Sequence, residues 1–192
     1  MLKLGFLASR HGSNMQAVID ACAEGGLNAK PVVIISNNSK SGAGDRARKE
    51  KIPFYHLSGR THPDAETLDT AILDALLKYE TDLVILAGYM KKIGLKTLDR
   101  FQGKILNIHP ALLPKFGGEG MYGTSVHEAV LASGDKETGV TIHLADGEYD
   151  TGPIVAQTRV PVLEGDTVES LASRVLDREH TFLVETLKKF ES

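Results

Sequence analysis

The stretch Asp82-Leu83-Val84-Ile85-Leu86-Ala87 is almost continuously apolar, and it decides the fold class. Such a run is typical of a strand in a parallel sheet that helices cover on both faces. Upstream, a second apolar strand over residues 4–8 enters a polar turn, after which apolar residues recur at helical spacing. Strand, small turn and helix in this order open an α/β protein. The sequence therefore predicts a parallel α/β sheet.

The composition restricts the class of protein. The 192 residues are 42% hydrophobic and 24% charged, as in ordinary soluble globular domains. A formal net charge of −3 provides no basic surface for nucleic acid. Cys22 is the only cysteine, which excludes an intrachain disulfide and a multi-cysteine zinc site and favours a reducing compartment. Because no stretch resembles a signal peptide or a membrane span, we expect a single cytoplasmic domain over residues 1–192 that has no membrane partner.

The turn Ser9-Arg10-His11-Gly12-Ser13-Asn14 lies between the first strand and the first helix. A helix N-terminus offers unpaired backbone N–H groups, and Gly12 lets a ligand approach the main chain closely. Together with the helix dipole, this predicts a phosphate site at Gly12, Ser13 and Asn14. An alternative is that Ser13 or Asn14 simply caps the helix.

Two familiar phosphate motifs are absent from this part of the chain. No G-x-G-x-x-G follows the first strand, and no Gly-Lys-Ser/Thr closes a Walker loop. The strand over residues 31–35 also ends without an acidic residue that could bind a ribose diol. A nicotinamide dehydrogenase is therefore disfavoured, while a mononucleotide phosphate remains open.

A polar pair ends the run Lys104-Ile105-Leu106-Asn107-Ile108-His109-Pro110. Side chains alternate faces along a strand, so Asn107 and His109 point the same way. An amide and an imidazole together suit a carbonyl group, because one can hold its oxygen while the other handles a proton. They could instead be strand-end residues that bond to nearby backbone. None of the seven histidines is arranged as a cluster, and we expect no metal.

Four further segments add to the candidate site. Residues 88–94 follow the central strand, and ligands in parallel sheets bind beyond such strand ends. Residues 117–123 hold four glycines, which predicts a mobile flap, and the loop 146–153 carries three carboxylates. In the closing helix, predicted over about 167–188, Glu179 falls inside the apolar stripe at about 100° per residue. Its carboxylate needs a donor or a ligand, unless it pairs with Arg174 or Arg178.

Four motifs together resemble one family over essentially all 192 residues. They are Gly-Ser-Asn at 12–14, Asn-Ile-His-Pro-Ala-Leu-Leu-Pro at 107–114, Glu-Tyr-Asp-Thr-Gly-Pro at 148–153 and Arg-Val-Leu-Asp-Arg-Glu-His at 174–180. In these four motifs the chain is similar to the folate-dependent phosphoribosylglycinamide formyltransferase family. Asn-x-His with a downstream Asp is shared by the wider group of 10-formyltetrahydrofolate enzymes, and the turn and Glu-His narrow the resemblance.

The resemblance implies a mixed, mostly parallel sheet with helices on both faces. A Rossmann-like, mononucleotide-binding half over residues 1–103 would precede a catalytic and folate-binding half over residues 104–192. The implied reaction transfers the formyl group of 10-formyltetrahydrofolate, a co-substrate, to the amine of 5′-phosphoribosylglycinamide in purine synthesis. The implied partners are these small molecules, with the protein a monomer or a homodimer.

The resemblance also implies site residues. The catalytic residues would be Asn107, His109 and Asp150, and we expect the Asp150 carboxylate to raise the pKa of His109. The ribonucleotide would contact Gly12, Ser13, Asn14 and Glu179. The folate would contact Met90, Lys91, Lys92, Ile93, Asn107, Asp146, Gly147, Glu148, Tyr149 and Asp150.

The chain departs from the usual family pattern at Arg10, where a glycine is common, and at Ala65, where many members carry an arginine for the folate tail. Two alternative functions remain. A formyltetrahydrofolate deformylase would use water as acceptor and would need no phosphate site. A non-catalytic mononucleotide-binding module would use the turn at 12–14 and would leave the Asn107/His109 pair unexplained.

Overall fold

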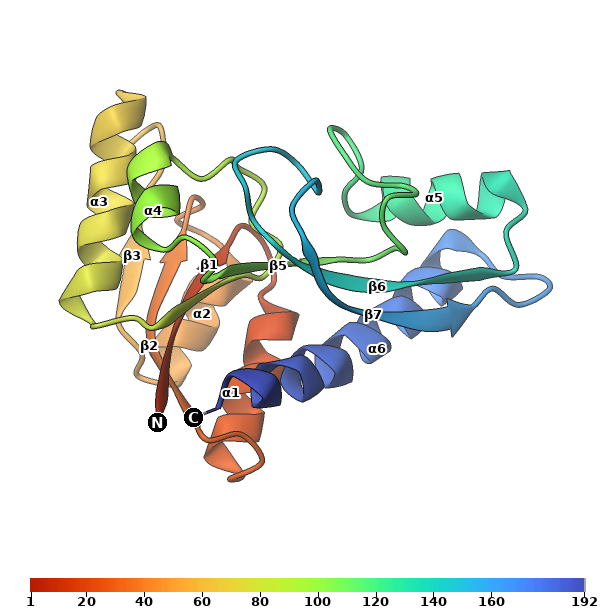
Figure 1. Cartoon of the computed structure of the whole chain (residues 1–192), viewed down its shortest axis with the longest axis horizontal. Helices are drawn as coiled ribbons and strands as arrows, with labels where there is room; N and C mark the ends of the chain where they lie inside the picture. Colours follow the sequence, from red (N-terminus) through yellow and green to blue (C-terminus); the bar gives the residue numbers. More distant parts are fainter. Residues whose placement is uncertain (192) are drawn as a thin grey trace.

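Within residues 1–191, which the computed structural model describes, a seven-stranded sheet is flanked by six α-helices and a short 3-10 helix (Figure 1). The strands are β1 (Leu2–Ala8), β2 (Ala29–Ser36), β3 (Phe54–His56), β4 (Leu83–Leu86), β5 (Ile105–His109), β6 (Glu137–Leu144) and β7 (Ile154–Pro161). The helices are α1 (Ser13–Ala23), α2 (Gly42–Lys49), α3 (Ala65–Lys78), α4 (Leu95–Arg100), α5 (Thr124–Ser133), α6 (Val168–Leu187) and the 3-10 helix η1 (Lys188–Phe190).

The sheet has the strand order β3-β2-β1-β4-β5-β6-β7 and is mixed. Strands β1 to β5 pair in parallel, and β6 and β7 are antiparallel to their neighbours. The order reverses at β1 and β4, which are neighbours although β2 and β3 lie between them in the sequence. Loops that leave such a switch point diverge and open a crevice at the carboxyl ends of the strands. The predicted ligand segments at 9–14 and 88–94 are these two loops.

Alternating side chains of β1 supply two separate cores. Phe6 and its neighbours pack with α1, α2 and α6 on one face, whereas Leu7 packs with α3 and the end of α4 on the other. Both side chains are fully buried, as expected for a central strand that helices cover on both faces. The predicted α/β class with a mixed, mostly parallel sheet is confirmed.

Helix α1 begins directly at the predicted phosphate turn. Its N-cap is Gly12, which has a φ of 70°, and no side chain caps the helix. The alternative in which Ser13 or Asn14 caps α1 is therefore wrong. A Cβ at position 12 would lie 3.0 Å from the Cβ of Ala43, so both the backbone conformation and the space favour glycine.

Helix α4 does not follow from the sequence patterns, because six residues are too few for an apolar stripe. The carboxylate of Asp69 on α3 accepts the backbone N–H groups of Lys96 at 2.8 Å and Thr97 at 3.2 Å. These groups belong to the first turn of a helix, where N–H donors lack an intrahelical partner. Asp69 thereby fixes the start of α4 and the loop that leads into it.

No helix in the described part of the chain combines the length and the apolar character that a membrane span requires.

Candidate active site

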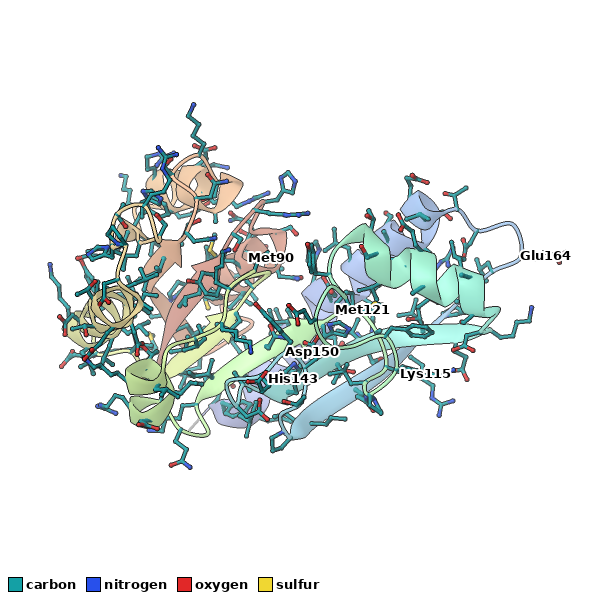
Figure 2. The ribbon with its side chains drawn as sticks, turned by 90° about the horizontal axis from the view of Figure 1, so that it is seen from above. Met90, Lys115, Met121, His143, Asp150 and Glu164 are labelled. Atoms are coloured by element: carbon teal, nitrogen blue, oxygen red, sulfur yellow. The ribbon has the colours of Figure 1, made fainter. Side chains whose placement is uncertain are left out.

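A cavity of about 820 Å³ opens where the loops after β1 and β4 diverge. Its walls come from these loops, the end of β5, the flap, the loop after β6, the start of α5 and one face of α6. Figure 2 shows Met90, Met121, His143 and Asp150 near the centre of the molecule, between the part with β3 and α3 and the part with α5 and α6. The cavity thus joins segments from both ends of the chain.

Asp150 lies beside both residues of the polar pair. Its Oδ2 is 3.4 Å from Nδ1 of His109, and its Oδ1 accepts a hydrogen bond from Nδ2 of Asn107 at 3.3 Å. The backbone N–H of Gly118 in the flap donates to Oδ2 at 3.0 Å. Asp150 has a φ of 59°, which few residues other than glycine adopt. The structure therefore brings the amide, the imidazole and the carboxylate into contact.

The residue just before the flap, Phe116, decides which nitrogen of His109 can titrate. Nε2 lies 2.7 Å from the backbone carbonyl oxygen of Phe116. A carbonyl oxygen only accepts, so Nε2 carries the N–H and Nδ1 is left facing Asp150. The titrating nitrogen is therefore the one next to the carboxylate.

His143, which the sequence analysis did not place in the site, orients Asn107. The two residues lie opposite each other in the antiparallel register of β5 and β6. The Nδ1 of His143 is 2.9 Å from the carbonyl oxygen of Leu144 and so carries the N–H, which leaves Nε2 to accept from Nδ2 of Asn107 at 3.0 Å. The strand register thus points the NH2 group of Asn107 toward His143 and Asp150.

Burial and charge oppose each other in this cluster. Burial lowers the pKa of His109, and the Asp150 carboxylate and the Phe116 carbonyl offset this only in part. The expectation that the pKa of His109 is raised is therefore wrong for this site, because withdrawal from water outweighs the carboxylate. Burial acts to raise the pKa of Asp150, but the nearby His143, whose Nε2 is 3.4 Å from Oδ1, the charge of His109 and the N–H of Gly118 outweigh it and lower that pKa. At neutral pH the site holds a carboxylate beside a neutral imidazole.

Glu179 lies at another wall of the same cavity. Its side chain on α6 is buried, and its Oε2 accepts from Nδ2 of Asn14 at 2.8 Å. Arg174 and Arg178 pair with other carboxylates, so the alternative of an arginine partner is wrong. Burial raises the pKa of Glu179 to about 7, although the Asn14 amide opposes this. The Oδ1 of Asn14 is buried and has no hydrogen-bond partner among the described residues.

The two loops predicted to enclose the folate both border the cavity and contact each other. Residues 90–93 and 147–150 line it. Between the loops, Nζ of Lys92 is 2.7 Å from Oε2 of Glu148 and 5.3 Å from the ring centre of Tyr149. Asp146 does not line the cavity. Its carboxylate accepts from the Thr151 hydroxyl and the Glu148 N–H and so shapes the loop.

The cavity lining differs from the predicted set at further positions. Gly12 and Ser13 do not line it, whereas Arg10 and His127, which were not assigned to the site, do. The guanidinium of Arg10 lies next to the flap, with Nη1 at 3.5 Å from an ideal Cβ on Gly123. No group of three or more His, Cys, Asp or Glu side chains is placed to hold a metal ion within residues 1–191.

Comparison with known proteins gives the family. A profile of the formyl transferase family matches residues 2–187. The phosphoribosylglycinamide formyltransferase of Haemophilus influenzae is 37% identical over 99% of this chain and 87% of its own length. The chain belongs to the phosphoribosylglycinamide formyltransferase family. Within this formyltransferase family, the solved glycinamide ribonucleotide transformylase 1 of Symbiobacterium toebii has a TM-score of 0.92 at 38% identity, covering 99% of this chain and 87% of that one.

Other relatives of this chain are longer or more distant. The chloroplastic phosphoribosylglycinamide formyltransferase of Arabidopsis thaliana is 42% identical over 96% of this chain, which spans 64% of that protein. The chain spans 60% of the similar protein of Vigna unguiculata. A solved formyltetrahydrofolate deformylase from Pseudomonas syringae, 24% identical with a TM-score of 0.85, shares the fold alone.

Proposed function

We propose that this formyltransferase-family protein transfers the formyl group of 10-formyltetrahydrofolate to the amine of 5′-phosphoribosylglycinamide in purine synthesis. One observation carries the proposal: a single cavity holds Asn14 and Glu179 together with the contact between Asn107, His109 and Asp150. The names of the relatives at 37% and 42% identity support the same reaction. Both substrates are small molecules of a size that a cavity of about 820 Å³ can hold.

The ribonucleotide would lie between the start of α1 and the face of α6 that carries Glu179. Backbone N–H groups at Gly12, Ser13 and Asn14 would hold the phosphate, with the dipole of α1 favouring its negative charge. Glu179 would hydrogen-bond to the ribose or the glycinamide part, either as acceptor or, when protonated, as donor. The folate would lie between residues 90–93 and 147–150, where Met90 and Ile93 supply apolar surface.

The chemistry would take place at the end of β5. The amine attacks the formyl carbon, and negative charge develops on the formyl oxygen. Nδ2 of Asn107 can donate to that oxygen, because its bond to Asp150, at 3.3 Å, is longer than its bond to His143, at 3.0 Å, and can be exchanged.

One proton must leave the amine, and one must reach the departing folate nitrogen. Nδ1 of His109 and the adjacent carboxylate of Asp150 are placed to accept and return a proton. Much of the acceleration would come from holding the amine and the formyl group together in the cavity.

A two-substrate assay tests the reaction. The enzyme receives 10-formyltetrahydrofolate with and without the ribonucleotide, and both formylated product and formate are measured. We expect folate turnover only when the ribonucleotide is present. Formate release at the same rate without it would establish the deformylase alternative instead.

Substitution of His109 by alanine separates an enzyme from a binding module. We expect kcat to fall by about 10²- to 10³-fold, the usual effect of removing one group that stabilises the transition state. Calorimetry should show that the variant still binds the ribonucleotide, since the proposed phosphate site is at the start of α1 and not at the end of β5. A wild-type protein that binds the ribonucleotide but turns over neither substrate would be the module.

A further inference from the structure

A buried histidine outside the catalytic cluster lines the same cavity, and one nitrogen of its ring has no hydrogen-bond partner among the described residues. His127 on α5 is 6% exposed and lines the cavity. Its Nδ1 is shielded from solvent and has no hydrogen-bond partner among the described residues. A buried polar atom without a partner costs about 1–3 kcal/mol, so a bound group that pairs with it recovers that cost. The nitrogen therefore points to a ligand.

The first turn of α5 aims His127 at the cavity. Thr124 and His127 are three residues apart, which puts them on one face of the helix, and both line the cavity. The N-cap, Gly123, provides no side-chain cap, and the first turn holds no acidic residue. The dipole at this end of the helix disfavours a positive charge, and burial together with the charge of His109 lowers the pKa of His127. The imidazole is therefore neutral at neutral pH and can accept a hydrogen bond.

The neighbours of His127 indicate which substrate it meets. His109, which lines the same cavity, lies at the proposed reacting centre. Helix α5 packs against α6, which carries Glu179 on the proposed ribonucleotide wall. The proposed folate loops at 90–93 and 147–150 belong to other elements. The group of the ribonucleotide that must approach His109 is its amine, and an amine can donate N–H hydrogens.

We infer that His127 is a further substrate-binding residue, whose Nδ1 accepts a hydrogen bond from the glycinamide amine and turns the lone pair of that amine toward the formyl carbon. The inference rests on the proposed function and deepens it. Asn14, another residue that lines the cavity, also has a buried acceptor without a partner among the described residues, its Oδ1. This part of the cavity is thus complementary to a ligand that brings donors.

Two substitutions of His127 test the contact. Leucine has a similar volume and no acceptor, whereas asparagine places an amide oxygen near the position of Nδ1. We expect His127→Leu to lower kcat/KM for the ribonucleotide by about 10- to 100-fold, as for the loss of one hydrogen bond to a buried acceptor. The KM for the folate should stay unchanged, and His127→Asn should recover most of the lost activity. Calorimetry with the ribonucleotide alone should show the same ranking of the three proteins.

Thr138→Val is the matched control. The Thr138 hydroxyl is likewise buried and unpartnered in the described structure but does not line the cavity, so its removal should change neither KM. The inference is overturned if His127→Leu binds and turns over the ribonucleotide as the wild type does. Equal impairment of the leucine and asparagine variants, or an equal rise in both KM values, would also overturn it. Failure of the proposed function would appear separately, as a wild type without ribonucleotide-dependent turnover.

Discussion

Glu179 is the residue at which burial has the largest consequence for the whole protein. Its carboxyl group sits among the apolar side chains of α6, and its hydrogen bond comes from the neutral amide of Asn14. Because no cation compensates the burial, the folded protein holds a proton on this residue up to about pH 7. The unfolded chain releases that proton at a lower pH, so folding takes up a proton between the two pKa values.

Stability should therefore fall as the pH rises from about 4.5 to about 7, because the folded state binds the extra proton throughout this range. The difference between the pKa of Glu179 in the folded and in the unfolded chain corresponds to a loss of about 3 kcal/mol in the free energy of unfolding. Glu179→Gln keeps the shape and cannot ionise, so it should be more stable than the wild type at pH 8 and similar to it at pH 5. Urea unfolding at both pH values, followed by circular dichroism, measures the difference.

The comparison with the variant removes the contribution of other titrating groups. Burial also lowers the pKa of His109 and of His127. A histidine with a lowered pKa reduces the free energy of unfolding as the pH falls, which is opposite to the effect of Glu179. These contributions are common to the two proteins and cancel in the difference. An equal change of stability with pH in wild type and variant would show that Glu179 ionises freely.

Single residues of the site could be predicted where one periodicity was enough. Alternation along β5 placed Asn107 and His109 on one side, and helical spacing placed Glu179 on the apolar stripe, and both placements are confirmed. His143 could not be predicted, because its position opposite Asn107 depends on the register between two strands that are far apart in the sequence. The unpartnered nitrogen of His127 is visible only when all its neighbours are known.

At the scale of elements, the start of α1 depends on one glycine. Gly12 has φ of 70°, and an added Cβ would lie 3.0 Å from the Cβ of Ala43 on α2. We expect Gly12→Ala to destabilise the protein by about 1–2 kcal/mol through backbone strain and to raise the KM for the ribonucleotide by moving the N–H groups that hold the phosphate. Urea unfolding and steady-state kinetics measure the two effects.

Gly25→Ala is the matched control, because Gly25 has a φ of 75° but nothing within 4 Å of an added Cβ. It should lose a similar amount of stability and leave the KM for the ribonucleotide unchanged. Identical kinetics of the two variants would mean that the turn at Gly12 does not hold the phosphate.

Helix α4 makes a second prediction at this scale. Its first N–H groups are held by Asp69, and Oδ1 of Asp69 also accepts from the Thr97 hydroxyl at 2.5 Å. Asp69→Ala would leave these donors buried, so we expect a loss of about 1–3 kcal/mol in unfolding free energy. Because the 90–93 loop leads into α4, the KM for the folate should rise more than that for the ribonucleotide.

Asp69→Asn keeps an acceptor oxygen and serves as the control, with an intermediate loss of stability. If Asp69→Ala raised both KM values equally, α4 would not position the folate loop. A long, periodic element such as α6 could be predicted from the sequence. Helix α4 could not, because its stability comes from a carboxylate on another helix and not from its own pattern.

At the scale of the whole molecule, the two halves implied by the resemblance share one sheet and the core on one of its faces. The core on one face of the sheet combines Met15 and Val18 of α1 with Leu171, Val175 and Leu183 of α6. The segment after α6 also contacts the first half of the chain, because Oε1 of Glu191 accepts the N–H of Asn28 at 2.6 Å. The fold class followed from the sequence, but this return of α6 onto α1 did not, because hydrophobic spacing shows which face of a helix is buried and not what covers it.

We therefore expect residues 1–103 and 104–192 to fold only together. A fragment of residues 1–103 would lack the cover of α6 on α1, and it would expose the edge of β4 that pairs with β5. It should remain unfolded or aggregate, and its far-ultraviolet circular dichroism should lack the native helix signal.

The full chain should unfold in one transition, with coincident curves from circular dichroism and from the fluorescence of its five tyrosines. Mixing the two fragments should restore ribonucleotide-dependent turnover. A fragment 1–103 with a dispersed, native-like NMR spectrum would instead make the first half an independent nucleotide-binding domain.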